Sequence, residues 1–156
     1  MLAQNKIAVA TWADWWGFKM EAHDAVVQNA AMVSQAPGGR AIIHSDSAVD
    51  VQRLNQEAAK AYYAAKHKGM AVTENEALRW ITMNPAWAMG VDKVTGSLEA
   101  GKRADVVLWS AHPFSVYAKA HTVWVEGVRE LDAGKTQKTW SDFEVGQVPG
   151  LSLIHI

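Results

Sequence analysis

The sequence predicts an α/β fold, and three observations support this prediction. Short apolar segments at 6–11 and 40–44 flank a stretch of helical periodicity, which is the order expected for a βαβ unit. Two further segments with helical patterns, 50–69 and 73–84, follow the second apolar segment. Beyond them the character changes, because 104–127 contains short runs rich in β-branched residues that indicate a small β region.

The βαβ unit is built from four consecutive segments. KIAVAT (6–11) is apolar after one charge, as in a short buried strand, and apolar residues then recur near the helical period over 21–36. Pro-Gly-Gly at 37–39 ends this predicted helix, and RAIIH (40–44) forms the second strand. Because such strands are parallel and adjacent, the loops after both should meet at one sheet edge, where ligand sites gather.

The next two helices carry clear boundary signals. Residues 50–69 form a long amphipathic pattern, and a glycine closes it. Thr73 and Glu76 stand at the spacing of a capping box, which predicts that a helix over 73–84 begins there.

Asn84 and Pro85 predict a new N-cap followed by proline at the first position of a short helix. Strands are then predicted over 104–109 and 121–127, and Gly127 permits a tight turn after the second of them.

Composition excludes several classes of function. The chain has 156 residues, of which 49% are hydrophobic, which is enough for a packed core. With 15 basic and 16 acidic residues, it offers no electrostatic reason to propose nucleic acid or an anionic membrane as a partner. The absence of cysteine excludes disulfides and zinc–thiolate sites. No apolar run approaches the roughly 20 residues of a membrane-spanning helix.

A long motif lies over 84–131, where N-P-A-x-A-x-G is followed after a short spacer by G-S-L-E-x-G-K-x-A-D-V-V. This stretch resembles the C-terminal part of the amidohydrolase superfamily, and most closely the imidazolonepropionase-like enzymes. The resemblance extends from residue 6 to about 131. It implies the last two βα units of a (β/α)8 TIM-like barrel, with 6–11 and 40–44 as its seventh and eighth strands. Part of a small β-sandwich, the composite domain, would follow.

The resemblance also implies a division of the chain. Residues 1–90 would be the C-terminal portion of the barrel, 91–133 part of the β-sandwich, and 134–150 a tail. The apolar end LSLIHI (151–156) equals one reading-frame translation of a transposase adapter, so these residues are expected to be non-native.

Asp46 is the main candidate for chemistry. The resemblance places it where the family's last metal ligand lies, after strand eight, and a carboxylate there can bind a divalent metal and take a proton from an attacking water. Without that resemblance, Ser-Asp-Ser after a strand is most often an N-cap or an Asx turn.

Four further residues are candidates for substrate binding. Strand alternation places His44 on the same face as Asp46, although it could equally be a packed layer residue. Trp16, Lys19 and Glu21 lie in the loop after the first strand, where they would form a pocket wall or a hydrophobic lid. Four residues are weaker candidates. Arg53 and Asn55 are expected on a solvated helix face, and His112 and His121 are expected to be ordinary core or surface histidines.

The leading hypothesis is a fragment of a metal-dependent amidohydrolase that cleaves an amide or cyclic amide bond. Metal-activated water would attack, with Asp46 as metal ligand and proton shuttle, and the metal would be zinc, as one or two ions. The family's His-x-His pair is absent, since no two of the six histidines have that spacing. The isolated fragment is therefore expected to be inactive. The predicted partner is a small-molecule substrate, and neither nucleic acid nor a membrane is expected to bind. Whether the complete protein forms a homo-oligomer is left open. The alternative is a non-catalytic α/β scaffold or binding module.

Overall fold

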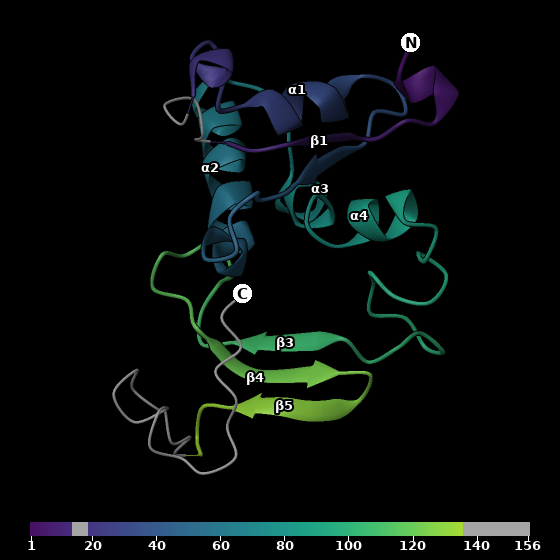
Figure 1. The fold of residues 1–156 in the computed structure, drawn as a ribbon, viewed down its shortest axis with the longest axis vertical. Helices are drawn as coiled ribbons and strands as arrows, with labels where there is room; N and C mark the ends of the chain where they lie inside the picture. The colour runs from purple at the N-terminus through teal and green to yellow at the C-terminus, as the bar shows by residue number, and fades with distance from the viewer. Residues whose placement is uncertain (14–18, 136–156) are drawn as a thin grey trace.

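The computed structural model describes residues 1–13 and 19–135 of the chain (Figure 1). A two-stranded sheet with its helices forms one part, and a three-stranded sheet forms the other. The strands and α-helices in chain order are β1 (Val9–Thr11), α1 (Asn29–Gln35), β2 (Ala41–Ile43), α2 (Leu54–His67), α3 (Glu74–Arg79), α4 (Met83–Ala88), β3 (Val106–Trp109), β4 (Ala120–Val125) and β5 (Val128–Asp132). Short 3-10 helices cover Ala3–Asn5, Met20–Ala22 and Asp50–Arg53.

The predicted parallel pair of strands is confirmed. β1 and β2 pair in parallel, with Val9 opposite Ala41 and Thr11 opposite Ile43. The backbone N–H of His44 donates to the Thr11 carbonyl at 3.1 Å, just beyond the paired residues. The loops that follow the two strands therefore leave the sheet at the same edge.

The helix predicted over 21–36 is shorter than the periodicity indicated. Only Asn29–Gln35 is α-helical, and Met20–Ala22 forms a separate 3-10 turn. The side chain of Asn29 donates to the Thr11 hydroxyl at 2.7 Å and to the Trp12 carbonyl at 2.9 Å, which ties the first turn of α1 to the end of β1. This tertiary contact sets the start of the helix, and a pattern of apolar residues does not report it.

The capping box before α3 is confirmed, whereas the N-cap predicted at Asn84 is wrong. Thr73 accepts from the Glu76 N–H, and the Glu76 carboxylate accepts from the Thr73 N–H at 2.7 Å. α4 begins at Met83, so Asn84 lies inside its first turn. The buried Asn84 amide donates instead to the Ala41 carbonyl at 2.8 Å, because the outer edge of β2 offers an acceptor there.

The segment between α3 and α4 covers the outer edge of β2. The Ile43 N–H donates to the Trp80 carbonyl at 3.1 Å, beside the bond that Asn84 makes. The Trp80 side chain is 1% exposed, and its indole N–H donates to the Ser34 hydroxyl of α1 at 2.7 Å. This segment thus joins α1, β2 and the α3–α4 pair into one core.

The later β region is a three-stranded antiparallel sheet in the order β3-β4-β5. The predicted tight turn at Gly127 is confirmed, since Glu126 and Gly127 have φ values of 52° and 83°, the left-handed pair of a hairpin turn. No helix among residues 1–13 and 19–135 is long and apolar enough to span a membrane.

The loop between β3 and β4 packs onto α2. Phe114 is buried with its ring centroid 5.8 Å from that of Tyr62, and Asn55 donates to the Pro113 carbonyl at 2.6 Å. The expectation that Asn55 lies on a solvated face is therefore wrong, because this residue is 7% exposed and satisfies a backbone acceptor from the other part of the chain.

Candidate functional site

The segment that follows β2 brings two predicted site residues together. The Nδ1 atom of His44 lies 3.4 Å from the Oδ1 atom of Asp46. The His44 side chain is 31% exposed and that of Asp46 is 55% exposed, so both can be reached by a solute. An imidazole and a carboxylate in this arrangement can offer one nitrogen and one oxygen to a cation.

Two serines on either side of Asp46 make the hydrogen bonds of the turn. The Ser45 hydroxyl contacts the backbone N–H and carbonyl of Ser47, and the Ser47 hydroxyl accepts from the N–H groups of Val49 and Asp50. The turn therefore does not use the Asp46 carboxylate as its capping group. The Ser45 and Ser47 hydroxyls make the side-chain hydrogen bonds of the turn in place of Asp46, and the N-cap position of the 3-10 helix Asp50–Arg53 is Val49.

Trp12 completes this edge of the sheet, although the sequence did not single it out as a site residue. Its ring meets the His44 ring edge-on, with centroids 4.7 Å apart and an interplanar angle of 73°. Trp12 directly follows β1, just as His44 directly follows β2. These equivalent positions after two adjacent strands are the sequence signal from which their contact could have been predicted.

Glu57 of α2 binds the loop after β1, a role that the sequence did not predict. It is 6% exposed on α2, and its carboxylate accepts from the Ala13 N–H at 3.2 Å and from the Lys60 ammonium at 2.6 Å. One carboxylate thus links α2 to the loop that carries Trp12. The sequence shows Glu57 only as one acid of a charged helix, so its partner 44 residues away could not be read.

Replacing Glu57 with Ala should lower the free energy of unfolding by about 1–3 kcal/mol, because the buried Ala13 N–H would lose its acceptor. Urea unfolding of the variant beside the parent chain measures this loss. Glu130→Ala is the matched control, since this glutamate is exposed on β5. Equal losses in the two variants would show that Glu57 does not anchor the loop.

The other predicted binding residues belong to the segment that follows β1. Lys19 and Glu21 are both exposed. Lys19 lies just before the 3-10 turn Met20–Ala22, and Glu21 lies within it. Trp16 lies outside the residues that the structure describes, as do all the predictions for 136–156.

The donors present suit a metal but do not complete a site. Asp46 and His44 offer the oxygen and nitrogen ligands that zinc accepts, and a catalytic zinc uses about three protein ligands. Within residues 1–13 and 19–135, no three acidic or histidine side chains are grouped closely enough to hold a metal ion. The described edge therefore fits part of a ligand set.

Comparison with known proteins gives a consistent result. A model described as "Amidohydrolase family" matches residues 22–148. The chain is 28% identical to the amidohydrolase tasK of Hapsidospora irregularis over 125 residues, which is 80% of this chain and 12% of that protein. It is 33% identical to the imidazolonepropionase of Bacillus cytotoxicus over 78 residues, which is 46% of this chain and 18% of that enzyme.

Among solved structures, the crystal structure of an amidohydrolase from Thermotoga maritima MSB8 matches with a TM-score of 0.66 and 28% identity. The match covers 84% of this chain and 33% of the Thermotoga chain. The chain therefore spans at most a third of the length of these three relatives.

Proposed function

We propose a function on the basis that this chain belongs to the amidohydrolase family. In this proposal, the chain is part of a metal-dependent hydrolase that cleaves an amide or cyclic amide C–N bond in a small molecule. The observation that carries this proposal is the His44–Asp46 pair, held 3.4 Å apart where two parallel strands end. The Asp46 carboxylate at this edge is accessible, and the hydrogen bonds of the turn beside it are made by Ser45 and Ser47.

The proposed architecture is the last two βα units of a barrel over 1–90 and part of a β-sandwich over 91–133. The parallel pairing of β1 with β2 and the antiparallel β3–β5 sheet support it. A closed barrel would pair both edges of β2, so the contacts that Trp80 and Asn84 make with the outer edge would have to give way to a neighbouring strand.

In the proposed reaction, a divalent metal, with zinc as the expected ion, would supply Lewis-acid activation and a water acidified to a pKa near 7 when bound. Asp46 accepts the proton of the attacking water and returns it to the leaving nitrogen, as its exposed carboxylate allows. His44 holds the carboxylate in orientation and lines the substrate face, while Trp12 fixes the imidazole ring. Trp16, Lys19 and Glu21 are proposed as the pocket wall.

A non-catalytic binding module is the second candidate. The incomplete ligand set among the described residues favours it, because two donors do not hold a catalytic zinc. The two candidates differ in one measurable property, which is hydrolysis that depends on a metal.

Removing the metal from the complete protein should abolish hydrolysis of cyclic amides, and adding zinc back should restore it. The measurement is the hydrolysis rate before chelation, after chelation and after addition of zinc, with metal content determined at each stage. Hydrolysis that persists in metal-free protein would overturn the metal-dependent mechanism. A complete protein that binds no metal and hydrolyses no amide would support the binding module.

A further inference from the structure

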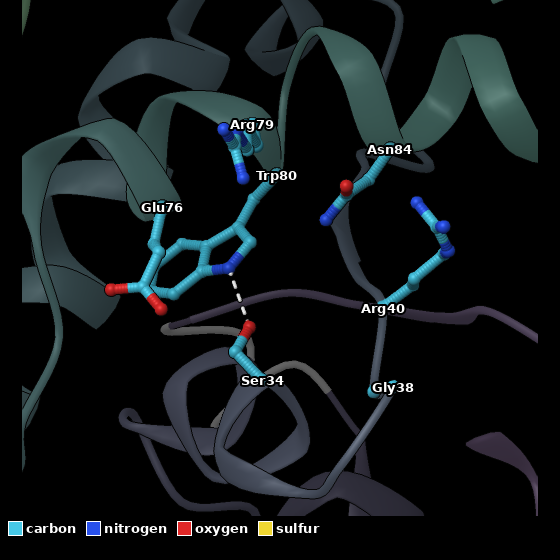
Figure 2. A pocket seen from close by; sticks show the side chains of 8 residues that line it. Ser34, Gly38, Arg40, Glu76, Arg79, Trp80 and Asn84 are labelled. Atoms are coloured by element: carbon cyan, nitrogen blue, oxygen red, sulfur yellow. Dashed lines mark hydrogen bonds between the residues drawn. The ribbon is translucent and has the colours of Figure 1, made fainter.

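A cavity of about 210 Å³ lies at the other end of β2 from the His44–Asp46 pair. Arg40, which directly precedes β2, lines it, together with Arg79 of α3 and with Trp80 and Asn84 (Figure 2). Since His44 stands four positions after Arg40, the two sites are separated by roughly 13 Å along the strand. The cavity is therefore distinct from the site proposed for hydrolysis.

The charge of the cavity lining is positive. Two guanidinium groups face one carboxylate, that of Glu76. The Glu76 carboxylate accepts the hydrogen bonds of the capping box, and those from the Thr73 backbone and hydroxyl, with a smaller effect of the nearby Arg79 charge, hold its pKa below the ordinary value. Among the described residues, no carboxylate lies within ion-pair distance of Arg40 or Arg79.

Arg40 is held in place without using its hydrogen-bond donors. Its guanidinium carbon lies 4.1 Å from the centroid of the Trp87 ring, which is a cation–π contact. A cation–π contact does not require the guanidinium N–H groups as hydrogen-bond donors, and these groups form the fork that matches the oxygens of a phosphate or carboxylate.

Two further side chains of the wall, Trp80 and Asn84, donate hydrogen bonds within the chain. The Trp80 N–H is bonded to Ser34 and the Asn84 amide N–H to the Ala41 carbonyl, as Figure 2 shows for the first of these. Gly39 lines the cavity in a turn so tight that a Cβ atom there would lie 1.9 Å from the Val33 carbonyl oxygen. The two arginines are thus the cationic donors of this cavity, and no hydrogen bond from either side chain is found among the described residues.

We propose that this cavity binds a small molecule through a phosphate or carboxylate group, with Arg40 and Arg79 donating to its oxygens from two sides (Figure 2). The chain as a whole carries a net charge of −1, so general attraction of anions does not account for such binding.

The test is a titration of the complete protein with inorganic phosphate and, separately, with acetate, both at constant ionic strength maintained with chloride. The probe is the NMR signal of the arginine side-chain N–H groups. Phosphate or acetate should shift the signals of Arg40 and Arg79 in a saturable way, and the stronger of the two identifies the ligand group. Arg40→Ala and Arg79→Ala should each weaken binding by about tenfold or more.

Arg53→Ala is the matched control, because Arg53 is exposed on the 3-10 helix Asp50–Arg53 and does not line the cavity. This variant should bind with unchanged affinity. Arg40→Lys keeps the charge, and its spectrum shows whether the fold survives loss of the guanidinium. Signals of Arg40 and Arg79 that do not respond to either anion, or equal affinity in the alanine variants of a folded chain, would overturn the proposal.

Discussion

The proposed mechanism predicts that Asp46→Asn in the complete protein lowers kcat/KM for amide hydrolysis by about 10²–10⁴-fold, the range typical of a positioned proton-transfer group. An amide side chain has nearly the same shape as a carboxylate, but it cannot accept the proton of the attacking water. The loss should appear in kcat, since the acidic group acts on the transition state more than on substrate binding. Steady-state kinetics on the parent and variant enzymes measure it.

Metal content separates the two roles proposed for Asp46. If Asp46 is a ligand as well as a proton acceptor, the Asn variant should also bind metal more weakly, whereas a proton acceptor alone would leave metal content unchanged. Asp50→Asn is the control. Asp50 is an acidic residue close to Asp46, but it is the first residue of the 3-10 helix Asp50–Arg53, and its backbone N–H donates to the Ser47 hydroxyl. Hydrolysis at the parent rate in Asp46→Asn would remove this residue from the mechanism.

The sequence could predict this edge because local rules determine it. Strand alternation places His44 and Asp46 on one side, and the βαβ order places them beside the loop after β1. Both rules operate over a few residues or one supersecondary unit, and the structure has the corresponding parallel register and a His44–Asp46 separation of 3.4 Å.

The supporting residues could not be predicted because their partners are distant in sequence. Glu57 meets Ala13 across 44 residues, Asn84 meets Ala41 across 43, and Asn55 meets Pro113 across 58. Each is a polar residue on a helix, where solvent exposure is the ordinary expectation. Burial of a backbone donor or acceptor opposite them, which only the packed fold creates, reverses that expectation.

Trp80 is the residue whose truncation should cost the most stability, at about 3–5 kcal/mol for Trp80→Ala. Its side chain is 1% exposed, and the deletion would open a void between α1, β2 and α3 while leaving the Ser34 hydroxyl without its donor. Because the Trp80 carbonyl also receives the Ile43 N–H, movement of this segment would reach β2 next to the turn that carries Asp46. Urea unfolding monitored by circular dichroism measures the loss.

Two further variants divide this effect into packing and hydrogen bonding. Trp80→Phe keeps most of the buried ring and should lose much less stability than Trp80→Ala, while Ser34→Ala removes the acceptor alone and should cost about 1 kcal/mol. The same ring forms one wall of the arginine-lined cavity, so Trp80→Phe should retain phosphate binding if the arginines carry it. A loss below about 1 kcal/mol in Trp80→Ala would contradict this packing, since a fully buried tryptophan cannot be removed so cheaply from a close-packed core.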